Sequence, residues 1–153
     1  MEIKEASAAD IPQLCGLLEA LFAQEAEFTP ERAAQERGVR MVLETPELGA
    51  VLTACEGDRV VAMVTLLYTV STALGERVAL LEDMVVSPAE RGKGVGSALL
   101  TYAVAYAREK GCRRVTLLSD GDNESAHRFY ARHGFRRSAM VPFRMETAGG
   151  GTP

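Results

Sequence analysis

A glycine-dense turn between a predicted strand and a predicted helix constrains the fold of this chain more than any other feature. Apolar residues from Val78 to Val86 predict a long, largely buried strand, and residues 94–110 have the three- and four-residue apolar spacing of a helix. Between them, glycines stand at positions 92, 94 and 96. Because glycine has no β-carbon, the amides of this turn and the positive end of the helix can approach an anion closely. The segment therefore predicts an α/β protein with an anion-binding turn.

The spacing of the glycines distinguishes between the common phosphate-binding turns. A Walker A loop needs Gly-x-x-x-x-Gly-Lys-Ser/Thr, and this pattern is absent from the chain. The dinucleotide pattern Gly-x-Gly-x-x-Gly fails because Ser97 stands where its last glycine belongs. Neither pattern fits this chain.

The turn instead resembles a signature of the GNAT superfamily of N-acetyltransferases. Arg91, Gly94 and Gly96 match its Arg/Gln-x-x-Gly-x-Gly/Ala pattern after the typical Val-x-Pro. Residues 123–135 resemble a later motif of the superfamily, in which an Asn precedes a short helix that ends in Phe-Tyr and is followed by Gly-Phe. The resemblance extends over the chain apart from its last residues. The Leu-Glu-Asp sequence before the turn is most similar to the diamine and polyamine acetyltransferase branch.

The resemblance implies that the co-substrate is acetyl-CoA. Backbone amides of residues 84–86 are expected to pair with the pantetheine amides, and the turn is expected to bind the pyrophosphate. Asn123 and Ser125 are coenzyme ligands by resemblance, but both are also ordinary helix caps. The expected coenzyme-binding residues are Met84, Val85, Val86, Arg91, Gly92, Lys93, Gly94, Val95, Gly96, Ser97, Asn123, Ser125, Ala126 and Tyr130.

Two residues are candidates for proton transfer in the direct attack of a primary amine on the acetyl thioester. Tyr130 aligns with the general-acid tyrosine of the superfamily, and its phenol can protonate the leaving thiolate. The alternative for Tyr130 is packing in an aromatic core. Glu82 lies in an apolar strand and is the candidate base, directly or through water; its alternatives are an ion pair or a solvated position. Because side chains alternate along a strand, either Glu82 or Asp83 is expected to point inward.

The expected acceptor is a small cationic amine, which Glu25 and Glu27 could attract, although solvated helix-end charges explain these two acids equally well. An aminoglycoside-type acetyltransferase and a protein N-terminal or lysine acetyltransferase are the rival enzymes. A non-enzymatic acyl-CoA-binding regulatory module is the alternative from another class. Homodimers are common among the proteins that this chain resembles, so a homodimer is expected.

The composition argues against several other partners. The formal charge is −4, and basic residues are interspersed with acidic ones, which argues against a nucleic-acid or membrane-surface partner. No apolar run approaches the roughly 20 residues of a membrane helix, and we expect a cytoplasmic protein. Residues 120–131 lack the glycine and glutamate of a calcium loop, and His127 and His133 are poorly spaced for a shared metal. No metal is expected, and the three cysteines are expected to be reduced, buried thiols.

The predicted fold is a mixed, mostly antiparallel twisted sheet with helices on both faces. Helices are expected near residues 11–22, 30–43, 94–110 and 125–133. In the third helix, Val95, Leu99, Tyr102 and Tyr106 share one face, and the small residues Ala98, Ala103 and Ala107 are expected to keep that face close to the sheet. Strands are expected at 1–6, 50–55, 59–70, 78–86, 115–118, around 135 and at 141–145. The sheet is expected to splay near Val86. Residues 1–147 are expected to form a single domain, followed by a flexible Gly-rich tail at 148–153.

Overall fold

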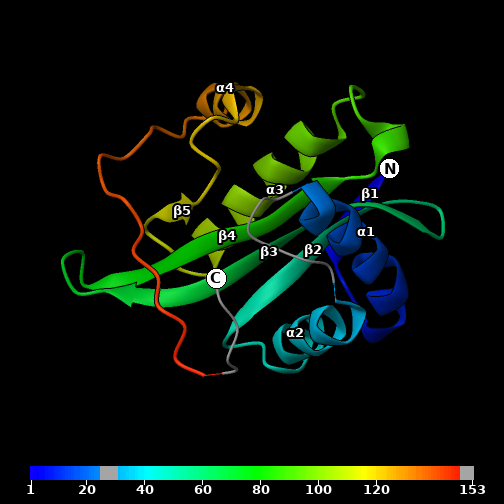
Figure 1. Ribbon diagram of the computed structural model, residues 1–153, viewed down its shortest axis with the longest axis horizontal. Helices are drawn as coiled ribbons and strands as arrows, with labels where there is room; N and C mark the ends of the chain where they lie inside the picture. Colours follow the sequence, from blue (N-terminus) through cyan, green and yellow to red (C-terminus); the bar gives the residue numbers. More distant parts are fainter. Residues whose placement is uncertain (25–30, 149–153) are drawn as a thin grey trace. The chain divides into compact units, whose positions relative to one another are not determined.

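The computed structural model describes residues 1–24 and 31–148 (Figure 1). It divides the chain into two compact units, Met1–Leu118 and Ser119–Pro153. The single domain expected over residues 1–147 stays a prediction, and Ala148 is the only described residue of the expected tail. The elements of the first unit are β1 (Glu2–Glu5), the short 3-10 helix η1 (Ala8–Asp10), α1 (Ile11–Gln24), α2 (Arg32–Glu44), β2 (Gly49–Glu56), β3 (Arg59–Ser71), β4 (Glu76–Val86), the 3-10 helix η2 (Pro88–Glu90), α3 (Val95–Glu109) and β5 (Val115–Leu117); the second unit contains α4 (Glu124–Arg132).

The first unit is built on a five-stranded sheet in the order β1-β2-β3-β4-β5. The first four strands pair antiparallel with their neighbours, and β5 pairs parallel with β4. Short turns join β2 to β3 and β3 to β4, whereas α1 and α2 lie between β1 and β2, and α3 supplies the crossover that the parallel pair β4 and β5 needs. The mixed, mostly antiparallel sheet predicted from the sequence is confirmed.

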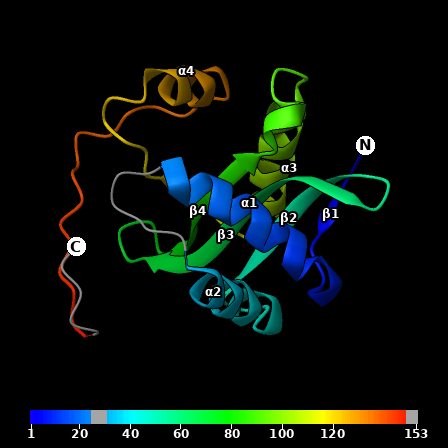
Figure 2. The ribbon, with the colours of Figure 1, turned by 45° about the vertical axis from the view of Figure 1, so that its right-hand side comes forward.

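Helices cover both faces of this sheet, with α1 and α2 on one face and α3 on the other (Figures 1 and 2). The apolar stripe of α1 packs with Val39 of α2 against the strands, where Val51, Met63 and Val85 are buried. On the other face, α3 buries Leu99 and Ala103 completely. At roughly 25 cal/mol per Å² of apolar surface removed from water, these two layers are the main stabilising feature of the unit.

The 3-10 helix η1, which precedes α1, begins with a capping box formed by Ser7 and Asp10. The backbone N–H of Ser7 donates to Asp10 Oδ2 at 2.8 Å, so a side chain satisfies an amide that precedes the helix. The predicted buried thiols are also confirmed, because Cys15, Cys55 and Cys112 are buried and unbridged. Within the described residues, no helix is long and apolar enough to cross a membrane.

The predicted terminal strands are not formed. Residues 135–147 carry no strand or helix assignment. Val141, Phe143 and Met145 have the alternating apolar pattern of a strand, yet their exposed fractions are 72%, 95% and 80%. Alternating apolar residues form a strand only where a neighbouring strand completes the backbone hydrogen bonds. The local sequence does not show whether such a neighbour is present.

Candidate active site

The glycine-dense turn has the backbone geometry expected of an anion cradle. Gly92 and Gly94 adopt φ values of 80° and 81°, in the left-handed region that glycine favours, and Gly94 caps the N-terminus of α3. The first hydrogen bond of α3 runs from the Ala98 N–H to the Gly94 carbonyl at 3.1 Å. The amides of residues 95–97 therefore have no acceptor within the helix and lie at its positive end. This is the geometry of an anion-binding turn, and its binding of a pyrophosphate stays a prediction.

A charged cluster that the sequence did not predict borders this turn. The buried Glu90 carboxylate accepts hydrogen bonds from Arg59 Nη2 at 2.9 Å and from Lys93 Nζ at 3.3 Å. Hydrogen bonds from Arg59 first, and then from Lys93, hold the pKa of Glu90 below its ordinary value. Arg59 lies 31 residues before Glu90, so no local pattern could reveal the contact. Glu90 thus ties the beginning of β3 to the predicted phosphate turn.

Arg91, the first residue of the signature, is exposed and bonds back to the preceding strand. Its Nε donates to the Val86 carbonyl at 3.2 Å. This hydrogen bond joins the turn to the last residue of β4. Val86 and Arg91, both predicted to touch the coenzyme, are therefore brought together.

Strand β4 is irregular immediately before the turn. Met63 pairs with Val85 but Thr65 pairs with Glu82, so a single β3 residue faces both Asp83 and Met84. This is a β-bulge, and Asp83 within it has φ 55°, which is uncommon outside glycine. The pairing between β4 and β5 ends at Leu81, as expected of a sheet that splays before Val86. Backbone groups of β4 beyond Leu81 are thus not paired to β5.

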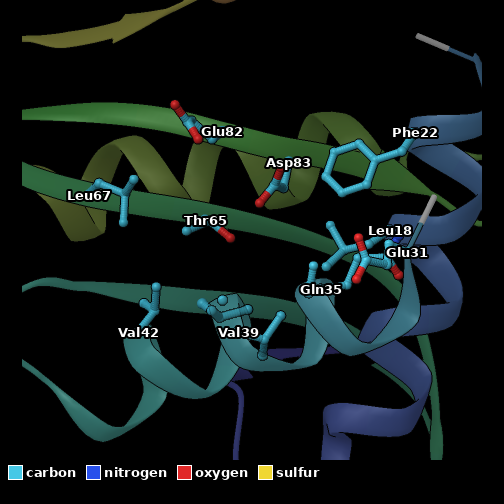
Figure 3. A pocket seen from close by; sticks show the side chains of 13 residues that line it. Leu18, Phe22, Glu31, Gln35, Val39, Val42, Thr65, Leu67, Glu82 and Asp83 are labelled. Carbon is cyan, nitrogen blue, oxygen red and sulfur yellow. The ribbon is translucent and has the colours of Figure 1, made fainter. Parts of the chain in front are cut away.

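A pocket opens between α1, α2 and the bulged part of the sheet, with a volume of about 410 Å³ (Figure 3). Its walls are mostly apolar, and polar side chains gather on the side of β4 and at the start of α2. The apolar lining includes Leu18, Phe22, Val39, Val42, Val51 and Leu67, and the polar lining is Glu31, Gln35, Thr65, Glu82 and Asp83.

The two acids of β4 differ in their surroundings. Glu82 is exposed and Asp83 is partly buried. In Figure 3 the two side chains leave the strand in different directions, with Asp83 on the side of Thr65. Both nevertheless line the pocket, because the bulge interrupts the regular alternation of side chains. The predicted base Glu82 therefore lies at the pocket, and its role stays a prediction.

Gln35 is a buried polar side chain of the pocket that no motif indicated. Only 7% of the residue is exposed, and neither Nε2 nor Oε1 has a hydrogen-bond partner among the described residues. Buried side-chain amides almost always form hydrogen bonds in folded proteins. An unpartnered amide on a residue that lines a cavity therefore calls for an explanation. Sequence reasoning missed Gln35 because it stands among charged residues in an ordinary amphipathic helix.

The second unit carries the other predicted site residues. Asn123 Oδ1 accepts a hydrogen bond from the Ala126 N–H at 3.1 Å. Asn123 therefore caps α4, which is the alternative role considered for it in the sequence analysis. Ser125 is exposed and Ala126 is partly buried. Their coenzyme contacts stay predictions.

Tyr130 lies on α4 in a small aromatic cluster. Its ring centroid is 5.2 Å from that of Phe129 and 5.7 Å from that of Phe135. Burial raises the pKa of Tyr130, so the phenol remains protonated beyond neutral pH and can act as a donor. The neighbouring His127 and His133 bond to backbone carbonyls at 2.9 Å. In the described part of the chain, no group of three or more His, Cys, Asp or Glu side chains could hold a metal ion.

Comparisons with known proteins follow the same motifs. A sequence model of the acetyltransferase (GNAT) family matches residues 13–135. The chain is 29% identical to the uncharacterized N-acetyltransferase YhfO of Bacillus subtilis, over 88% of this chain and 89% of that protein. It is 28% identical to the aminoalkylphosphonate N-acetyltransferase of Salmonella typhimurium, over 90% of this chain and 86% of that protein. A match to the uncharacterized N-acetyltransferase MJ1207 of Methanocaldococcus jannaschii, at 39% identity, spans 42% of this chain and 28% of that protein.

The fold comparison agrees with the sequence comparisons. A solved structure of a putative acetyltransferase from Agrobacterium tumefaciens superposes with a TM-score of 0.80 at 26% identity, covering 96% of this chain and all of that chain (100%). The family match includes the bulged strand, the glycine-dense turn and α4. The chain therefore belongs to the acetyltransferase (GNAT) family, whose members are acyl-CoA-dependent N-acetyltransferases.

Proposed function

We propose that the chain transfers the acetyl group of acetyl-CoA to a small cationic primary amine that binds in the pocket between α1, α2 and β4. The observation that carries this proposal is the arrangement along β4. The strand contributes Glu82 and Asp83 to the pocket and leads directly into the turn whose glycines favour a pyrophosphate. One rigid strand can therefore hold both reactants near each other, which converts a bimolecular encounter into a unimolecular step.

The lining of the pocket supports a cationic acceptor with a short apolar stem. Glu31, Glu82 and Asp83 bring three carboxyl groups to a cavity whose other walls are largely apolar. A carboxylate lowers the energy of a nearby ammonium and raises that of an anionic ligand. The diamine or polyamine branch indicated by the Leu-Glu-Asp sequence is the finer part of this proposal. The amine of the aminoalkylphosphonate named for the Salmonella relative is compatible with it.

The proposed chemistry needs one proton acceptor and one proton donor. Glu82, directly or through water, takes a proton from the ammonium, because an amine of pKa about 10.4 is mostly protonated at neutral pH. The free amine forms the C–N bond to the thioester carbonyl, the nitrogen releases its second proton to water, and the C–S bond then breaks. Tyr130 gives its phenolic proton to the departing thiolate. A backbone amide of residues 84–86 binds the developing oxyanion, where a well-placed donor contributes about 3 kcal/mol.

The catalytic proposal is tested by measuring CoA release with a panel of amines for the wild-type protein and Tyr130→Phe. The variant keeps the ring contacts of Tyr130 but loses the proton donor. We expect kcat to fall by roughly 10²-fold or more, with little change in the KM for acetyl-CoA. Tyr102→Phe is the matched control, because Tyr102 is an exposed tyrosine of α3. Equal kcat values for the two variants would contradict the assigned role of Tyr130.

Glu82 is tested in the same assay. Glu82→Gln should lower kcat/KM most at neutral pH and least at high pH, where the amine is already deprotonated. Glu47→Gln, at an exposed position of the α2–β2 connection, is the control. A uniform loss at every pH would favour a purely electrostatic role for Glu82.

The rival functions predict different results in these experiments. A protein or peptide acetyltransferase would acetylate peptide amines in preference to free amines, and an aminoglycoside-type enzyme would prefer an aminoglycoside. A regulatory module would be stabilised by acetyl-CoA in a thermal melt, since ligands that bind only the native state raise its stability, but would release no CoA with any amine. The homodimer and the cytoplasmic location remain proposals, to be tested by light scattering and by cell fractionation.

A further inference from the structure

The polar lining of the pocket is richer than a simple amine requires. An alkylammonium needs carboxylates and an apolar wall, and Glu31, Glu82, Asp83 and the aliphatic side chains supply both. Gln35 is neutral and adds nothing that a cation specifically needs. It nevertheless occupies the first turn of α2, with its backbone N–H bonded to the Glu31 carbonyl at 3.0 Å, so its position along the helix is fixed.

Gln35 lines the pocket, and its amide has no hydrogen-bond partner in the described chain. The residue is 93% buried, since only 7% is exposed, and both amide atoms are shielded from solvent and unbonded. Burial of such a group without a partner destabilises the folded state. An apolar residue of the same size would avoid that penalty while leaving the helix unchanged. The position therefore carries a cost that a function of the side chain would explain.

We propose that Gln35 determines acceptor specificity by pairing with a neutral amide group on the amine substrate. A glutamine side chain offers a donor and an acceptor side by side, and a carboxamide offers the complementary pair, so two hydrogen bonds form together when the side chain rotates to expose its amide to the pocket. The ammonium of the same molecule lies toward the acids of β4, and a short apolar linker crosses the aliphatic wall. This inference rests on the proposed function and names its substrate class: amines with an apolar linker and a carboxamide or peptide-type amide.

The test compares ω-amino carboxamides with alkylamines of the same length. We expect the wild-type protein to show a KM at least about tenfold lower for 4-aminobutanamide than for pentylamine, because a site with buried polar groups discriminates against ligands that leave them unpaired. Gln35→Met, which has a similar shape but no hydrogen-bonding amide, should abolish the difference. The KM for acetyl-CoA should not change. No preference for the amide in the wild-type protein, or a preference that survives in Gln35→Met, would overturn the inference.

The melting temperature of the free protein supplies a second test. A merely structural role of Gln35 would make Gln35→Met melt below the wild-type protein, whereas the proposed role does not. If the amide is unsatisfied without substrate, Gln35→Met should melt at or above the wild-type temperature. A lower melting temperature would mean that Gln35 has a structural partner and would overturn the inference. Gln24→Met, at an exposed position of α1 outside the pocket lining, is the matched control, and Gln35→Leu replaces Gln35→Met if the latter does not fold.

Failure of the proposed function is distinguishable from failure of this inference. If no amine were acetylated, the proposed function would fail, and the role of Gln35 would be decided by binding alone. Stabilisation of the wild-type protein but not of Gln35→Met by 4-aminobutanamide would still support it. Equal shifts for both proteins, or none, would overturn it.

Discussion

Replacing Gly94 with alanine tests the anion-binding turn most directly. Gly94 has φ 81°, and a Cβ added there would meet no protein atom within 4 Å. The stability cost therefore comes from the left-handed backbone alone, about 1–2 kcal/mol for a residue with a Cβ. For a chain of this size, that corresponds to a fall in melting temperature of roughly 2–8 °C.

Gly111 supplies the matched control at the other end of the same helix. Its φ is 84°, and a Cβ added there also meets no protein atom within 4 Å. Gly94→Ala and Gly111→Ala should therefore lose similar stability. Only the first places a methyl group where the amides of residues 95–97 are proposed to meet the pyrophosphate.

The two variants should differ in their affinity for acetyl-CoA. Loss of one charge-assisted hydrogen bond costs about 1.5–3 kcal/mol, which corresponds to a roughly 10- to 150-fold weaker Kd for Gly94→Ala. Isothermal titration calorimetry with acetyl-CoA measures this directly, and Gly111→Ala should bind like the wild-type protein. Equal Kd values for the two variants, at equal losses of melting temperature, would refute the assignment of the turn.

Two further predictions concern stability. Glu90→Gln should lower the melting temperature at pH 7, and the difference from wild type should shrink as the pH falls below about 4.5. The depressed pKa of Glu90 gives a stabilising contribution that is present above the unfolded-state value of 4.5 and is lost as the carboxylate becomes protonated in the native state. A difference that does not shrink as the pH falls would contradict the ion-pair origin. Leu14→Ala, at a fully buried position of α1, should cost about 2–5 kcal/mol in urea denaturation, whereas Leu48→Ala, with 39% of Leu48 exposed, should cost much less.

Local patterns allowed much of the fold to be predicted. The strands β2 and β3, the helices and the glycine-dense turn each depend on residues close in sequence. The helical face of α3 was only partly right. Ala103 and Ala107 are completely buried, as predicted, but Tyr102, which was predicted to share their face, is 37% exposed. Periodicity gives the repeat of a helix, but the small residues decide which side can approach a sheet closely.

The pocket depends on contacts that sequence reasoning could not supply. Gln35, Thr65 and Asp83 come from three elements far apart in the chain, and the bulge that brings Asp83 to the lining depends on the register between β3 and β4. Glu82 and Tyr130 were found because they stand in motifs. The predicted acidic residues Glu25 and Glu27 lie outside the described residues.

The shortness of β5 has a consequence for the motions of the sheet. Three residues, Val115–Leu117, join it to β4, and all three are partly exposed, whereas β3 pairs along most of its length on both sides. Segments with few buried contacts open at a lower free energy than the core of a domain. Backbone amides of β5 should consequently exchange with deuterium sooner than those of β3, and the edge of the sheet next to β4 should open before the centre of the sheet does.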